Sequence, residues 1–172
     1  MLTFKRCDSS NDDFQALVKE LDHYLAFIDG EEHAFYAQYN KIDSIKHVIV
    51  AYLDGRAVAC GAFKPYGEHG VEIKRMWASP TLRGQGLASR VLFELENWAS
   101  SLAYRFSVLE TGKSQADAVR LYEKNGYYVI PNYGQYTEAH HSVCYKKEFV
   151  STDQPPSVPQ DISTLTTHQL SV

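Results

Sequence analysis

The chain has 172 residues, of which 44% are hydrophobic and 13% aromatic, a composition that predicts one compact domain and excludes a disordered polymer. Its net charge is −4 and the two signs are interspersed, so we expect no nucleic-acid partner. Three widely spaced cysteines without a C-x-x-C pair argue against a disulfide framework and a zinc site, which favours a cytoplasmic location.

The sequence offers no candidate membrane anchor. No apolar run reaches the roughly 20 residues that span a bilayer, and residues 1–6 lack the long apolar core of a signal peptide. We therefore expect no membrane partner.

Strands and helices are predicted to alternate along the first part of the chain. Residues 2–7 are expected to form a strand. Residues 11–29 carry apolar side chains at helical spacing and end before Gly30, which predicts a helix. A second, short helix is predicted over residues 31–41.

A hairpin and a long helix follow. The dipeptide Asp54-Gly55 separates two apolar strands, a pattern typical of a β-hairpin, and residues 70–78 are expected to add a third strand. Apolar residues on one face predict a helix from Leu87 to about residue 102. The last elements are predicted as a strand, a helix and two strands, over residues 105–110, 115–124, 127–130 and 142–149. The sum is a mixed α/β layer fold.

The composition changes near residue 150. Residues 151–172 contain three prolines, many serines and threonines, and only two charged side chains. We interpret them as a polar C-terminal tail, which leaves residues 1–150 as the folded domain.

The segment LRGQGLAS, residues 82–89, concentrates small residues in the turn that opens the long helix. A helix N-terminus has unpaired N–H groups and a partial positive charge, and glycines let an anion approach the backbone. Gly84, Gln85, Gly86 and Leu87 would supply such donors. The alternative is that the two glycines only form a tight turn.

A nicotinamide-dependent enzyme is a second interpretation of these glycines. Residues 84–89 nearly match G-x-G-x-x-G, and Glu110 follows at a distance suited to a Rossmann fingerprint. However, Ser89 replaces the third glycine, and the preceding strand VEIKRMW is charged rather than apolar. The context therefore disfavours NAD.

Two stretches resemble the GNAT superfamily of acetyl-CoA-dependent N-acetyltransferases. The run VEIKRMWASPTLRGQGLASRVLFELENWA is similar to the family's central motif, which Arg83, Gly86 and Ala88 fill. The later run ADAVRLYEKNGYYV resembles its A-x-x-L-Y-E-x-x-G-[FY] segment. The resemblance covers residues 2–149 and implies a central, mostly antiparallel sheet of about seven strands flanked by helices.

The resemblance also implies how coenzyme A binds. The backbone of residues 84–89 would hold its diphosphate, and a bulged strand that parts from its parallel neighbour would pair with the pantetheine arm. The residues implied for the donor are Met76, Trp77, Ala78, Arg83, Gly84, Gln85, Gly86, Leu87, Ala88, Ser89 and Gln115. Arg83 either adds positive charge or is simply solvated, and Gln115 stands where many relatives have Asn.

Three residues are candidates for the chemistry. By resemblance, Tyr122 is the general acid that protonates the leaving thiolate, and either Glu72 or Glu110 is the base that takes the amine proton. Each has a structural alternative. Tyr122 could only pack its helix on the sheet, Glu72 could face solvent beside Lys74, and Glu110 could cap the helix near residue 115.

The activity implied is transfer of an acetyl group from acetyl-CoA to a primary amine of a small molecule or amino acid, directly in a ternary complex and without a metal. Family members often form homodimers, and the sequence leaves that state open. A non-catalytic coenzyme A sensor and a purely structural interaction domain remain alternatives. Polar residues between Asp29 and Asn40 either face a cationic acceptor or only favour a helix N-terminus, and His140-His141 receive no role.

Overall fold

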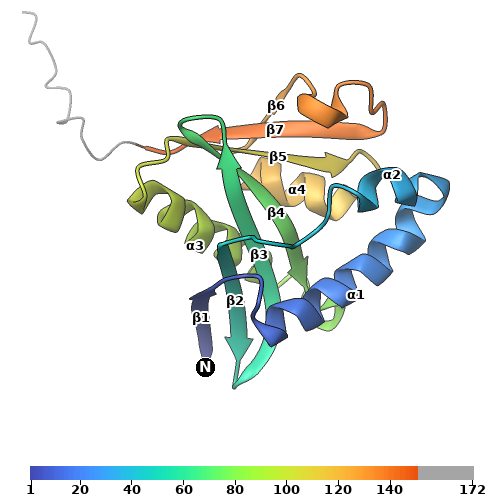
Figure 1. The fold of residues 1–172 in the computed structure, drawn as a ribbon. Coiled ribbons are helices and arrows are strands. Elements are labelled where there is room, and N and C mark those ends of the chain that lie inside the picture. Colours follow the sequence, from blue (N-terminus) through green and yellow to red (C-terminus); the bar gives the residue numbers. More distant parts are fainter. Residues whose placement is uncertain (151–172) are drawn as a thin grey trace, which may run out of the picture.

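The computed structural model describes residues 1–150 (Figure 1). The predicted tail, 151–172, lies outside the described residues. The strands of the described part are β1 (Leu2–Cys7), β2 (His47–Leu53), β3 (Arg56–Tyr66), β4 (Gly70–Ala78), β5 (Phe106–Gly112), β6 (Tyr128–Ile130) and β7 (Ser142–Glu148). Its α-helices are α1 (Asp12–Asp29), α2 (His33–Ala37), α3 (Leu87–Ser101) and α4 (Ala116–Lys124), with 3₁₀ turns η1 (Gly30–Glu32), η2 (Pro80–Leu82) and η3 (Gly134–Tyr136). Within residues 1–150, no helix has both the length and the apolar character needed to cross a membrane.

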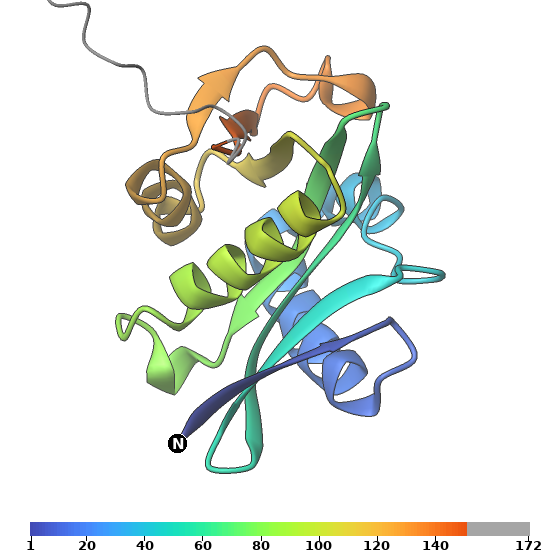
Figure 2. The same ribbon diagram turned by 90° about the vertical axis from the view of Figure 1, so that its left-hand side faces the viewer.

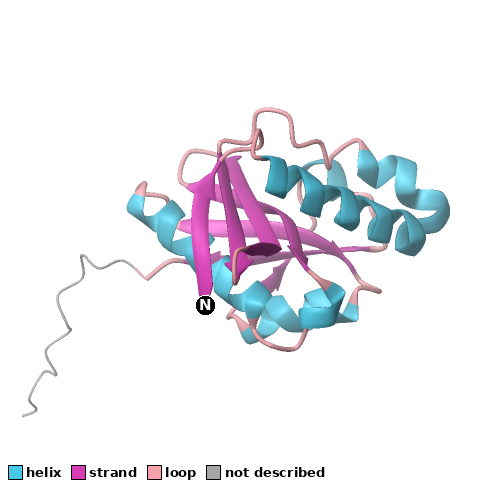
Figure 3. Cartoon of the chain, turned by 90° about the horizontal axis from the view of Figure 1, so that it is seen from below, coloured by secondary structure: helices cyan, strands magenta, loops and turns pink. Residues whose placement is uncertain are grey.

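The strands form one sheet in the order β1-β2-β3-β4-β5-β7-β6. Every neighbouring pair is antiparallel except β4 and β5, which run parallel. Helices cover both faces, with α1 on one side of β2 to β4 and α3 on the other (Figures 2 and 3). This arrangement confirms the predicted mixed α/β fold with a mostly antiparallel sheet. It is not the parallel sheet that an NAD-binding Rossmann domain requires.

Local chemistry explains where α1 begins and ends. The Asn11 side chain accepts a hydrogen bond from the Phe14 amide at 2.9 Å, which caps the helix, and two aspartates follow in its first turn. The helix buries Phe14, Leu17, Val18 and Leu21 against the sheet and ends at Gly30, whose φ is +52°.

The predicted helix over residues 31–41 was too long. A 3₁₀ turn, Gly30–Glu32, precedes an α-helix that spans only His33–Ala37. None of the residues of this short helix is buried. Since packing of an apolar face supplies most of a helix's stability in proteins, nothing here stabilises further turns.

The strands β4 and β5 separate soon after they start (Figure 1). They pair only between Gly70–Glu72 and Phe106–Val108. On its other side β4 shifts register against β3, and Arg75 at this bulge has a φ of +58°. Gly61 of β3 lies against the bulge so closely that a Cβ atom there would lie 2.4 Å from Met76 Sδ.

Candidate active site

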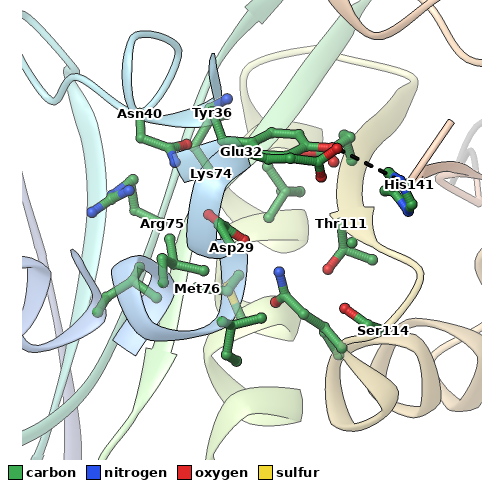
Figure 4. A pocket seen from close by; sticks show the side chains of 18 of the residues that line it. Asp29, Glu32, Tyr36, Asn40, Lys74, Arg75, Met76, Thr111, Ser114 and His141 are labelled. Atoms are coloured by element: carbon green, nitrogen blue, oxygen red, sulfur yellow. Dashed lines mark ion pairs between the residues drawn. The ribbon is translucent and has the colours of Figure 1, made fainter. Parts of the chain in front are cut away.

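A cavity of about 320 Å³ lies where β4 and β5 separate (Figure 4). Its walls come from α1 and η1, from α2 and Asn40 beyond it, from β4 and β5 beyond their last pair, from α4 and the turn before it, and from His141. The polar residues that line it include Asp29, Glu32, Tyr36, Lys74, Glu110, Gln115, Tyr122 and His141. The cavity therefore brings Glu110, Tyr122, Met76 and Gln115 of the predicted site together.

Tyr122 approaches the cavity from the sheet face that α3 and α4 cover. Its side chain is 6% exposed and its ring packs against the rings of Tyr127 and Tyr145, with centroids 5.7 and 6.2 Å away. Burial raises the pKa of Tyr122, and the Glu110 charge raises it further. The phenol is therefore protonated at neutral pH.

Glu110 lies on the opposite sheet face, beside the split. Ser142 Oγ donates a hydrogen bond to Glu110 Oε1 at 2.6 Å and lies 3.1 Å from the Tyr36 hydroxyl. Burial raises the pKa of Glu110, while the bond from Ser142 and the charge of Lys74 oppose that shift. A carboxylate with a raised pKa suits a general base. Glu110 does not cap α4, because no side chain makes a cap hydrogen bond there.

Glu72 does not line the cavity. It is only 4% exposed, whereas the sequence suggested a solvent-facing carboxylate. Tyr133, in the loop between β6 and β7, donates a hydrogen bond to Glu72 Oε2 at 2.7 Å. Glu72 Oε1 lies 3.7 Å from Lys74 Nζ and 3.9 Å from Lys64 Nζ. The predicted pairing with Lys74 is thus confirmed, but in a buried environment.

The glycine turn forms the N-terminus of α3. Gly84 and Gly86 each have a φ of +76°, the left-handed conformation that side chains disfavour. The first helical bond runs from the Arg90 amide to the Gly86 carbonyl, and within residues 1–150 the amides of residues 84–89 donate no backbone hydrogen bond. A Cβ at either glycine would meet no atom within 4 Å. The turn therefore presents unpaired donors to an open space, as an anion site requires.

The neighbours of the turn have structural contacts of their own. The Arg83 guanidinium stacks on the rings of Trp77 and Tyr24, 4.8 and 4.9 Å from their centroids, and Arg83 Nε donates to the Ala78 carbonyl at 3.4 Å. The Trp77 indole donates to Glu20 at 3.1 Å. These contacts join the turn to α1, and Arg83 stacks on the two rings while it remains exposed to solvent.

Several residues at the cavity were not predicted from the sequence. Tyr36 and Ser142 form the hydrogen-bonded chain to Glu110, and Lys74 lies opposite them. His141, which received no role, lies 3.6 Å from Glu32 across the cavity rim (Figure 4). The sequence signal was the polar cluster between Asp29 and Asn40, of which Asp29, Glu32, Tyr36 and Asn40 line the cavity. Among the described residues, no group of three or more His, Cys, Asp or Glu could hold a metal ion.

Comparison with known proteins identifies the family. Residues 12–127 match the model of the Acetyltransferase (GNAT) family. The chain belongs to this family. It is 33% identical over 138 residues to an IAA acetyltransferase of Azospirillum brasilense. The aligned region covers 78% of this chain and 90% of the relative. As a GNAT protein it is an acyltransferase, which confirms the predicted enzyme class.

Solved structures of GNAT proteins share the fold. A Klebsiella pneumoniae protein assigned as an acyl-CoA N-acyltransferase superposes with a TM-score of 0.72 at 28% identity and covers 86% of this chain and 97% of its own. PaiA N-acetyltransferase of Thermoplasma acidophilum, solved in complex with coenzyme A, gives a TM-score of 0.66 at 13% identity, with 87% of this chain and 99% of that one covered. At 13% identity the second likeness concerns the fold alone.

Proposed function

We propose that this GNAT protein transfers the acetyl group of acetyl-CoA to a primary amine of a small molecule or amino acid, by direct transfer in a ternary complex. The observation that carries the proposal is the cavity in the split between β4 and β5, which Glu110 and Tyr122 line from opposite faces of the sheet. An acid and a base on two sides of one small cavity suit a reaction that moves protons at two different atoms.

The donor would bind along the split. The unpaired amides of residues 84–89 suit a diphosphate, since charge-assisted hydrogen bonds are about twice as strong as neutral ones. From there the pantetheine arm would follow β4, whose edge beyond Glu72 has no β5 partner. Met76 and Gln115 line the cavity along this path. Membership of the Acetyltransferase (GNAT) family supports the choice of donor.

Glu110 would prepare the acceptor. An amine of pKa about 8 to 10 is largely protonated at pH 7 and must lose a proton before it attacks. Glu110 takes that proton, and the amine nitrogen then forms a bond to the acetyl carbon. A backbone N–H of β4 beyond Glu72 would stabilise the negative oxygen that develops on the carbonyl.

Tyr122 would complete the transfer. As the carbon–sulfur bond breaks, Tyr122 donates its proton to the thiolate. The proton that the nitrogen loses during amide formation restores the phenol, so the free thiol leaves and Tyr122 returns to its starting state. The ring contacts with Tyr127 and Tyr145 hold the phenol in position for this step.

The test compares two carboxylates of the same sheet face. Thiol release from acetyl-CoA is measured over a panel of amines for the wild type, Glu110→Gln and Glu72→Gln. We expect Glu110→Gln to lower kcat/KM by about 10²-fold or more. Because Glu72 does not line the cavity, its variant should retain most of the activity. If only Glu72→Gln loses activity, the base is Glu72 and not Glu110. Coenzyme A binding without transfer to any amine would favour the non-catalytic sensor.

We also propose that the reaction takes place in the cytoplasm. The three cysteines of the protein, Cys7, Cys60 and Cys144, are free, which is consistent with a reducing compartment.

A further inference from the structure

Two opposite charges face each other across the split between β4 and β5. In the last pair of these strands, Glu72 lies opposite Val108. Lys74 and Glu110 each lie two residues beyond that pair. Because side chains alternate along a strand, both project from the sheet face that α1 and α2 cover, and both line the cavity.

Lys74 and Glu110 act on each other without direct contact. Burial lowers the pKa of Lys74, and the charge of Glu110 is among those that oppose this shift. Burial also raises the pKa of Glu110, and Lys74 is among the groups that oppose it. Within residues 1–150 no ion pair joins the two side chains, so the space between their charges belongs to the cavity.

The Lys74 ammonium is buried but incompletely paired. Its side chain is 9% exposed, and its one hydrogen bond among the described residues goes to the Tyr136 hydroxyl at 3.3 Å. Glu72 lies 3.7 Å away and shares the same carboxylate oxygen with Lys64, whose side chain is 49% exposed and screened by water. These distances exceed those of charge-assisted hydrogen bonds, about 2.7–2.9 Å. An ammonium has three donors, so Lys74 can bind a further anion.

We propose that the acceptor is an α-amino acid, whose amine lies against Glu110 and whose carboxylate binds Lys74. The assignment rests on the proposed acetyl transfer. A simple cationic amine would meet the carboxylates of the wall, Glu110, Asp29 and Glu32, but would leave the buried Lys74 ammonium incompletely paired, which is costly. A zwitterion pairs both charges. Arg75 is the other cation of the cavity wall; one guanidinium nitrogen binds Asp22, while its buried Nε has no partner among the described residues, so the variants below are needed to assign the carboxylate to Lys74.

The test compares acceptors that differ only at the carboxylate. Thiol release from acetyl-CoA is measured with leucine, phenylalanine and methionine, with their carboxamides, and with the corresponding decarboxylated amines. We expect kcat/KM to be about tenfold to a hundredfold higher for the free acids, the range of a charge-assisted hydrogen bond. Equal or lower rates for the acids would overturn the inference and leave the proposed acetyl transfer intact.

Variants assign the preference to one side chain. Lys74→Met should lower kcat/KM for the acids more than for the carboxamides, so that the ratio between them approaches one, and Lys74→Arg should retain part of the preference. The ratio is the readout, because loss of the Lys74 charge also raises the pKa of Glu110 and so changes the rate with every acceptor. Lys64→Met is the matched control. It removes the other lysine at Glu72, lies outside the cavity wall, and should leave the preference unchanged.

The affinity for acetyl-CoA, measured by calorimetry, should be the same in wild type and Lys74→Met, which checks that the variant is folded. A preference for acids that survives in Lys74→Met would overturn the inference. Acetyl-CoA binding without transfer to any member of the panel would overturn the proposed acetyl transfer and this inference together.

Discussion

Tyr122 packs in the core and is also the acid of the proposed function. Only the second role needs its hydroxyl group. The ring is buried against Tyr127 and Tyr145, so phenylalanine keeps those contacts. We predict that Tyr122→Phe lowers kcat by about 10²-fold or more while the melting temperature stays close to that of the wild type. Steady-state thiol release and thermal unfolding measure the two effects. A variant with full activity would limit Tyr122 to packing.

The burial of Glu110 has a consequence for stability. A carboxyl whose pKa is raised in the folded state contributes stability that is present below its ordinary pKa, about 4.3, and is lost as the pH rises through the folded value. Glutamine cannot ionise, yet its carbonyl oxygen still accepts a hydrogen bond from Ser142. We therefore predict that Glu110→Gln becomes progressively more stable than the wild type as the pH rises from about 4 to 7.

Urea unfolding at several pH values between these limits tests this prediction. Glu138→Gln serves as the control, because Glu138 is an exposed carboxyl of the same part of the molecule and should give no such trend. A stability difference for Glu110→Gln that is constant, or that shrinks as the pH rises, would contradict a buried carboxylate.

In the proposed function, the glycine turn that starts α3 binds the diphosphate through its backbone amides. Gly86→Ala places a Cβ in the open space beside the amides and forces a side chain into a left-handed conformation. We predict that the KM for acetyl-CoA rises about tenfold to a hundredfold, because the diphosphate loses close approach to the backbone.

Backbone strain alone must be separated from lost binding. Gly55, in the hairpin between β2 and β3, also has a positive φ, +83°, and a Cβ there would likewise meet no atom within 4 Å. Gly55→Ala should therefore lower the free energy of unfolding by about as much as Gly86→Ala does, about 1–2 kcal/mol of strain, without changing the KM for acetyl-CoA. An equal rise in KM for both variants would contradict an anion site at Gly86.

The order and type of the elements could be predicted from sequence because the signals are local. Hydrophobic spacing, Gly30 at the helix end and the Asp54-Gly55 hairpin act within a few residues, and the helix and strands they predict are confirmed. The length of α2 could not be predicted, since it depends on how little of that helix is buried. The same limit explains why the sequence left open whether Glu72 faces solvent, because Tyr133 from a distant loop covers it.

The candidate site was predictable only where a motif specifies it. The glycine turn and Tyr122 lie in short, recognisable segments. The Tyr36, Ser142 and Glu110 chain joins α2, β7 and β5, which are far apart in sequence, so no local pattern predicts it. Lys74 is a further example. Its charge looks like ordinary strand polarity until the split in the sheet makes it part of a cavity wall.

At the scale of the whole molecule, the sheet is two parts joined by a short seam. Strands β1 to β4 and strands β5 to β7 meet only through three residue pairs between β4 and β5. The cavity depends on this short pairing, because further pairs between β4 and β5 would close the space between the two strands. Other contacts must therefore keep the parts in register.

A buried ion pair provides one such contact. Glu96 of α3, which packs on β2 to β4, binds Lys147 of β7, with Oε2 2.6 Å from Nζ, and also accepts a hydrogen bond from the Tyr127 hydroxyl at 2.9 Å. The Glu96 side chain is 9% exposed. The pair thus spans from the helix of one part to a strand of the other.

Removing one partner of this ion pair should lower the free energy of unfolding more than removing both. We predict that Glu96→Gln lowers the free energy of unfolding by about 1–3 kcal/mol, below the value for fully buried pairs because the Lys147 side chain is partly exposed. The double variant Glu96→Met with Lys147→Met should recover most of that loss, since it leaves no charge unpaired. Urea unfolding of the wild type, Glu96→Met, Lys147→Met and the double variant gives the coupling energy directly. Additive losses would mean that the two parts of the sheet are held in register by apolar packing, and that the ion pair is incidental to the split.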